Sequence, residues 1–113
     1  AGDDRLPTAL EVAALMRRAQ SAGDHAAVLR KGDPDRGALL LLIASRGQHV
    51  AMLERVLAGD GYAWARTLAD ESPSSREISA LIEKRARFDA DLWAVELDIA
   101  DPQRFIAELG AAG

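Results

Sequence analysis

Basic side chains cluster at the ends of several predicted segments, where they could together bind an anion. The candidate residues are Arg17, Arg18, Arg30, Lys31, Arg85 and Arg87. Arginine binds phosphate and carboxylate groups through its planar fork of donors, so a nucleotide, an RNA or a phosphorylated metabolite would suit such a site. The favoured alternative is that these charges lie on solvated faces and pair with Glu83, Asp89 and Asp91.

Arg85 has an unusual position within this set. It follows Ile78, Leu81 and Ile82 at the spacing of one helical face, so its Cα is expected to face the sheet. We therefore predict a partly buried, hydrogen-bonded pair between Arg85 and Asp89 or Asp91. The rival interpretation places Arg85 in a cleft, where it holds an anion.

The residue types that carry most enzyme chemistry are scarce. The chain has no cysteine and two histidines, His25 and His49, each at the start of a predicted strand. A two-histidine site would need a nearby carboxylate, and we expect both imidazoles at the surface edge. Phosphate-loop, zinc-protease and serine-hydrolase motifs are absent from the sequence. We predict no catalytic residues, no metal and no cofactor.

Two further groups favour structural roles. Asp33, Asp35 and Gly37 have the spacing that opens a calcium loop, but Ala44 stands where a bidentate glutamate is required, so this segment is predicted to be a turn. Trp64 and Trp93 could stack on bases or sugars, and we expect them instead in the core.

Composition limits the possible partners. The 113 residues carry 14 Lys and Arg against 18 Asp and Glu, a net charge of −4. An acidic chain is a poor general nucleic-acid binder, so nucleic acid is an unlikely partner. The longest apolar run, Ala38–Ala44, is too short to span a bilayer, which takes about 20 residues. We expect a cytoplasmic protein with one domain over residues 1–113, in which 1–6 and 111–113 are poorly ordered.

Hydrophobic periodicity predicts the elements that position these side chains. A helix is expected from Thr8 to Gly23, with Thr8 and Glu11 as a capping box. Four strands are expected to follow, at the ranges His25–Lys31, Leu39–Ile43, Val50–Val56 and Tyr62–Leu68. Their short connections favour an antiparallel meander.

The last third of the chain alternates helix and strand. Ser74 and Glu77 form a second capping box, which opens a helix. Leu92–Ile99 alternates as a half-buried strand, and Asp101-Pro102 opens a short last helix. The fold class is α+β, with an antiparallel sheet of about five strands in the order α-β-β-β-β-α-β-α.

The run Leu39–Ile43 also predicts an oligomeric state. A continuous apolar strand needs cover on both faces, while the first two helices are expected to cover one of them. The last helix is the competing cover. We therefore predict a homodimer, with an unidentified protein as a further partner.

Two segments together resemble a known family. His25–Gly37, followed by the arginine-rich helix end and the Phe88–Trp93 segment within Lys84–Glu96, is similar to the bacterial domain-of-unknown-function family 1491, from about Leu10 to Leu97. The resemblance implies a fold of its own and a cytoplasmic location. It implies no activity.

These observations favour a small non-catalytic interaction or binding module. The alternative is an anion-recognising domain that uses the basic residues, and an enzyme ranks third because its acid–base groups would have to be Asp, Glu and Arg alone.

Overall fold

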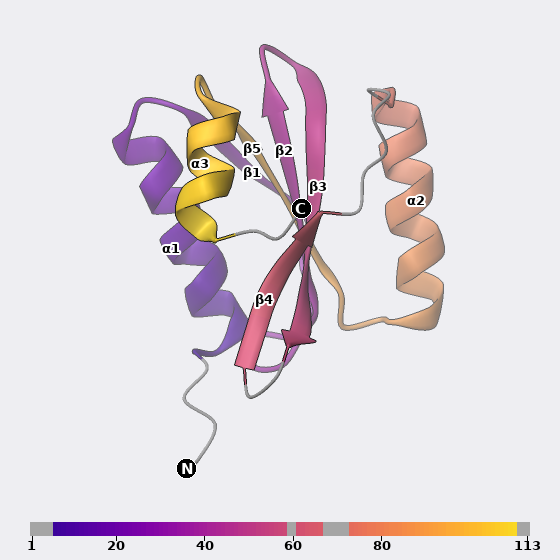
Figure 1. Ribbon diagram of the computed structural model, residues 1–113. Coiled ribbons are helices and arrows are strands. Elements are labelled where there is room, and N and C mark those ends of the chain that lie inside the picture. Colours follow the sequence, from indigo (N-terminus) through magenta and orange to yellow (C-terminus); the bar gives the residue numbers. More distant parts are fainter. Residues whose placement is uncertain (1–5, 59–60, 67–72, 111–113) are drawn as a thin grey trace.

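The computed structural model describes residues 6–58, 61–66 and 73–110, which form one sheet and three helices (Figure 1). The elements follow the predicted order and are α1 (Thr8–Ser21), β1 (His25–Arg30), β2 (Leu39–Ser45), β3 (Gln48–Ala58), β4 (Gly61–Arg66), α2 (Ser75–Phe88), β5 (Trp93–Asp98) and α3 (Pro102–Leu109). The α+β class is thus confirmed. Poor order was predicted for 1–6 and 111–113, of which 1–5 and 111–113 lie outside the described residues, as do 59–60 and 67–72.

The strand order differs from the predicted meander. It is β1-β5-β2-β3-β4, with β5 parallel to β2 and every other pair antiparallel. Only β2, β3 and β4 form a meander. The connection over residues 31–38 is long enough to pass the start of β5, so β5 fits between β1 and β2. The strands and the neighbours β2-β3-β4 were therefore predicted correctly, but the predicted pairing of β1 with β2 is wrong.

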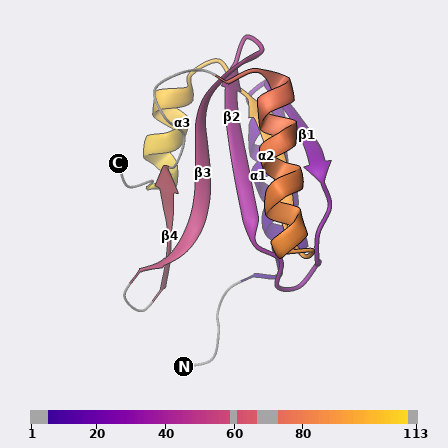
Figure 2. The same ribbon diagram turned by 90° about the vertical axis from the view of Figure 1, so that its right-hand side faces the viewer.

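The helices cover both faces of the sheet. α1 and α3 lie on one face, and α2 lies alone on the other (Figures 1 and 2). Leu39, Leu41 and Ile43 of β2 enter the core under α1 and α3, while Leu40 and Leu42 enter the core under α2. The two-sided burial of β2 is thus supplied within one chain. It no longer argues for the predicted homodimer.

Helix ends follow local chemistry at α2 and α3 but not at α1. Ser74 and Glu77 form the predicted capping box. Asp101 caps α3 before Pro102. At α1 the prediction is wrong, because Thr8 is the first helical residue and its buried hydroxyl donates to the carbonyl oxygen of Gly37, 2.8 Å away.

The segment from Gly32 to Gly37 packs tightly across the start of β5. A Cβ atom on Gly32 would lie 2.0 Å from the carbonyl oxygen of Asp91, which leaves no room for a side chain. The Asp33 carboxylate accepts hydrogen bonds from the amides of Asp35 and Arg36, as expected of a turn rather than a calcium site. The Asp33 carbonyl accepts a bond from Trp93 Nε1 at 2.6 Å.

Candidate functional site

The six predicted anion-binding residues are spread over both sides of the sheet. Arg17 and Arg18 belong to α1, whereas Arg85 and Arg87 belong to α2 on the opposite face. Arg18 lies over the Phe105 ring, 4.9 Å from its centroid, and pairs with Glu108 at 2.5 Å. This hydrogen bond from Arg18 lowers the pKa of Glu108. Arg18 thus serves to join α1 to α3.

Arg30 and Arg87 are the two candidates that come together. They line one shallow hollow with Glu83 and Ala86, and Lys31 is exposed nearby in the chain. Arg30 also donates to the carbonyl oxygen of Ala90 at 2.9 Å. Because the Glu83 carboxylate shares the hollow, its charge opposes the binding of a free anion there.

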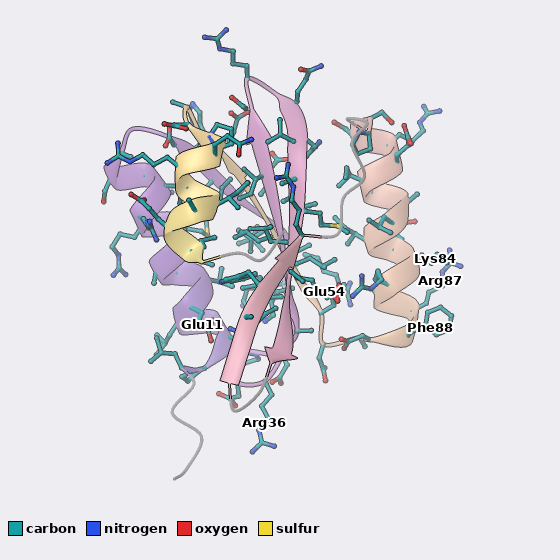
Figure 3. All side chains as sticks on the ribbon, in the orientation of Figure 1. Glu11, Arg36, Glu54, Lys84, Arg87 and Phe88 are labelled. Carbon is teal, nitrogen blue, oxygen red and sulfur yellow. The ribbon has the colours of Figure 1, made fainter. Side chains whose placement is uncertain are left out.

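The side chains at the end of α2 point into solvent. Figure 3 shows Lys84, Arg87 and Phe88 directed away from the sheet, and Phe88 is exposed. A single exposed aromatic residue on a helix end does not define a binding surface. The charged side chains at the end of α2 therefore add positive charge beside the hollow of Arg30 and Arg87, and they do not form a separate site.

Arg85 does form the predicted kind of pair, but with a different partner. Its Nη2 donates to Glu54 of β3 at 2.7 Å, across the sheet face that α2 covers. Asp89 and Asp91 were the predicted partners, and the Asp89 carboxylate instead accepts a bond from the amide of Asp91. The hydrogen bond with Glu54, helped by the charges of Glu54 and Asp89, raises the pKa of Arg85.

A double-mutant cycle can verify this partner. We expect Arg85→Ala and Glu54→Ala to show a coupling free energy of about 0.5–1 kcal/mol in urea unfolding, since the pair is partly exposed. The matched control is the cycle of Arg85→Ala with Asp89→Ala, which should show weaker coupling. Stronger coupling to Asp89 than to Glu54 would contradict the observed pairing.

The two histidines do not form a joint site. His25 is exposed, as predicted, but His49 is buried, with 5% exposure. His49 Nε2 lies 2.6 Å from Glu96 Oε2, so it has the carboxylate that a site would need. Across the sheet, His25 of β1 pairs with Asp98 of β5, Asp98 with Ala44 of β2, and Ala44 with His49 of β3. At the usual strand spacing the two histidines are therefore on the order of 14 Å apart. The surface prediction for His49 was wrong because β3 lies inside the sheet.

Trp93 is buried among the core residues under α1 and α3, as predicted, whereas Trp64 of β4 is half-buried and packs against the edge of the same cluster. Among the described residues, no three His, Cys, Asp or Glu side chains are placed to hold a metal ion. None of the described helices has the length and apolar character needed to cross a membrane.

Among the strand side chains that the structure describes, the exposed large apolar ones lie on the edge strand β1. β1 lies at one end of the strand order, and Figure 2 shows it as the outermost strand on its side. Val28 and Leu29 are 42% and 46% exposed. Leu29 also floors a groove between β1 and α2 of about 290 Å³, with Ser79, Ile82, Glu83 and Ala86 on the helix side.

The pairing of β5 shows which main-chain groups of β1 face outward. The amides of Trp93 and Ile99 donate toward β2, to Ala38 and Ala44. Because successive strand residues alternate in direction, Glu96 and Asp98 face β1 instead.

The partners of Glu96 and Asp98 on β1 are Ala27 and His25, whose main-chain groups therefore face β5. The N–H and C=O groups of Ala26 and Val28 accordingly point away from the sheet. A bulge between Val28 and Arg30 ends this regular stretch.

The sequence could not reveal this edge, because the strand order decides which strand is outermost. A retrospective signal exists in β1 itself, which has fewer large apolar residues than β2 and ends at Arg30, directly before Lys31. Charges of this kind are typical of edge strands.

Comparison with known proteins places the chain in a family. The model of the family described as "Protein of unknown function (DUF1491)" matches residues 6–107. A comparison with curated proteins gave no match.

Solved structures agree with this assignment. The crystal structure of a DUF1491 family protein from Caulobacter crescentus CB15 is 35% identical, with a TM-score of 0.75, over 89% of this chain and 94% of that one. An NMR structure of a DUF1491 family protein from the same organism gives 35% identity and a TM-score of 0.73, over 88% of this chain and 91% of that one. The solution structure of Atu0922 from A. tumefaciens is 30% identical, with a TM-score of 0.71, over 86% and 88%. The chain therefore belongs to the DUF1491 family, whose function is unknown.

Proposed function

We propose that this protein is a non-catalytic interaction module that receives an extended polypeptide segment alongside β1. The observation that carries this proposal is the edge position of β1, with the outward main-chain groups of Ala26 and Val28 beside exposed apolar side chains. An added strand would satisfy these groups and extend the sheet, a recurring mode of peptide recognition. A cytoplasmic location stays a prediction.

The side chains around β1 indicate what kind of segment fits. Val28 projects to the face of α1, and Leu29 lies in the groove on the face of α2, so apolar residues are favoured at the centre of the segment. Arg30, Lys31 and Arg87 lie toward the end of β1, so an acidic residue is favoured there. The bulge after Val28 limits the docked segment to a short strand.

The anion-recognising alternative has less support. Arg18 and Arg85 are engaged by Glu108 and Glu54, and Arg17 lies on the other face from Arg87. The remaining pair, Arg30 and Arg87, shares its hollow with Glu83. A carboxylate carried by a docked strand gains main-chain hydrogen bonds that a free anion lacks.

A library of short random peptides displayed on phage tests the proposal. Panning on the wild-type protein should enrich peptides with an apolar centre, an acidic residue and no central proline. Val28→Pro removes an outward N–H without removing a bond to β5, so the fold should persist while the affinity for a selected peptide falls by about tenfold or more.

The matched control is Val28→Thr, which keeps the N–H and the β-branched shape. It should retain most of the affinity, measured by fluorescence anisotropy, and thermal melts should show that both variants are folded. Equal binding of a selected peptide to the wild type and to a folded Val28→Pro protein would refute docking at β1.

A further inference from the structure

A cleft of about 350 Å³ opens between the C-terminal end of α1 and α3. Its volume is within the range of small-molecule sites in proteins. The floor is apolar, because Ala19, Ile99 and Phe105 belong to the core under α1 and α3. Five charged side chains line the rim, and they are Arg18, Asp24, Asp101, Arg104 and Glu108. The cleft lies on the other face of the sheet from the groove between β1 and α2, so it is separate from the peptide-binding edge.

Arginine side chains form one end of the cleft. Arg18 and Arg104 share the Glu108 carboxylate, since Arg18 Nη2 donates to Oε1 at 2.5 Å and Arg104 Nε donates to Oε2 at 3.3 Å. Two guanidinium groups thus face one carboxylate, and the positive charge is in excess. Arg18 is also held over the Phe105 ring, which fixes its guanidinium beside the floor. Within the described part of the chain, the remaining N–H groups of both guanidiniums have no acceptor, so they can donate to a ligand.

Carboxylates form the other end. Asp24 lies just beyond the end of α1, and Asp101 caps the start of α3. The main chain orients both groups through Oδ1, because Asp24 accepts from the amide of Ala100 and Asp101 accepts from the amide of Arg104, each at 3.2 Å. Neither carboxylate has a salt-bridge partner among the residues that the structure describes. Their Oδ2 atoms can therefore accept hydrogen bonds from a cation.

The packing of the two helices keeps these ends apart. Arg18 meets Glu108, which is near the end of α3, while Asp24 meets Ala100, which lies before its start. The helices thus run antiparallel here, and both place a carboxylate at the same end of the cleft. Arg18 precedes the end of α1 by about one turn, so roughly 5 Å of helix separates the arginine end from the carboxylate end.

We infer that this cleft binds a small zwitterion of the amino-acid class. The carboxylate of the ligand accepts from Arg18 and Arg104, and its ammonium group donates to Asp24 and Asp101. The carbon atoms between the two groups cover the apolar floor.

The distribution of charge selects a ligand that carries both signs. A simple anion would gain the arginine end but meet unpaired carboxylates at the other end, and a simple cation would meet the reverse arrangement. Only a molecule with an ammonium group and a carboxylate can pair with both ends at once. Free α-amino acids and ω-amino acids share this chemistry and differ in the distance between their charges.

Four small probes of matched size test the inference on the wild-type protein. The isomers 2-aminobutanoate and 4-aminobutanoate carry both charges at different separations, whereas butanoate lacks the ammonium group and butylammonium lacks the carboxylate. Titration followed by NMR should give saturable shifts at the amides of Ala100 and Arg104, which donate to the two aspartates. At least one isomer should bind with a dissociation constant on the order of millimolar. Each probe with a single charge should bind about tenfold more weakly or worse.

These titrations also state what would overturn the inference. The stronger isomer identifies the ligand as an α- or an ω-amino acid. Butanoate or butylammonium binding as tightly as that isomer would mean a plain anion or cation site. No shift at Ala100 and Arg104 with either isomer, up to tens of millimolar, would mean that the cleft does not bind this class of ligand.

Substitutions that keep the local hydrogen bonds locate the binding. Asp24→Asn and Asp101→Asn retain an oxygen for the amides that they accept from, and asparagine also caps helices, but both remove a charge. Arg104→Gln changes a side chain that is 76% exposed. Each variant should weaken binding of the stronger isomer by about tenfold or more.

Arg76→Gln is the matched control, because Arg76 is exposed on α2 at the other face of the sheet. It should bind like wild type, and so should Val28→Pro, which affects only the β1 edge. Unchanged affinity in folded Asp24→Asn and Arg104→Gln proteins would overturn the site while leaving peptide docking at β1 intact. If thermal melts show that a variant is unfolded, the four probes on the wild type still decide.

Discussion

Replacing Trp93 with alanine is expected to lower the free energy of unfolding by about 3–5 kcal/mol. The side chain is 4% exposed and packs in the core under α1 and α3. Its indole also holds the Gly32–Gly37 turn by donating to the Asp33 carbonyl. Truncation thus removes apolar burial, leaves a cavity and frees a turn that α1 also contacts through Thr8. Urea unfolding followed by circular dichroism gives the value.

Trp93→Phe separates the two contributions. Phenylalanine keeps most of the apolar volume but has no N–H for the Asp33 carbonyl. The free energy of unfolding should therefore fall by about 1–2 kcal/mol less in Trp93→Phe than in Trp93→Ala. A Trp93→Ala protein that is as stable as wild type but no longer binds a selected peptide would show that the indole is functional rather than structural.

The second large effect is expected at the ion pair of Glu11 and Arg55. The side chain of Arg55 in β3 is 8% exposed, and its Nη1 donates to Glu11 of α1. Glu11→Ala would remove this carboxylate from a guanidinium that is largely shielded from water, and breaking such a pair costs up to about 3–5 kcal/mol. Urea denaturation of the wild type and Glu11→Ala measures the loss.

A more exposed ion pair that joins α1 to α3 is the matched control. Glu108→Ala breaks the pair of Glu108 with Arg18, in which the two side chains are 46% and 41% exposed, so its effect on the unfolding midpoint should be small. Similar effects of the two substitutions would show that burial does not govern the contribution of Glu11.

Neighbouring charges on β3 explain how the two helix layers are held. Glu54 and Arg55 are consecutive, so their side chains point to opposite faces of the sheet. Glu54 pairs with Arg85 of α2, and Arg55 pairs with Glu11 of α1. One dipeptide thus fixes both α1 and α2 to the same strand.

The sequence predicted the elements well because their signals are local. Capping at Ser74 and Asp101, the stripe of α2 and the alternation before Ile99 each depend on a few neighbouring residues. The place of β5 between β1 and β2 depends on contacts between distant segments, which no local pattern encodes. The meander was predicted from short connections alone, and it is wrong because β5 comes from a distant part of the chain.

The same distinction applies to the site. The sequence indicated that Arg85 needs a carboxylate, and it suggested the nearest ones along the chain rather than Glu54, which lies 31 positions away. Glu11 was assigned to a capping box because it is three residues from Thr8, whereas its carboxylate meets Arg55, 44 positions away. The β1 edge followed only once the strand order was known.

Amide hydrogen exchange in β1, measured by NMR with and without a phage-selected peptide, tests the central claim most directly. In a single copy, the N–H of Ala27 faces β5, whereas the N–H groups of Ala26 and Val28 point outward. The account predicts that exchange at Ala26 and Val28 slows as a selected peptide is added, while exchange at Ala27 changes little. Fast exchange at Ala26 and Val28 under all of these conditions would contradict strand addition at this edge.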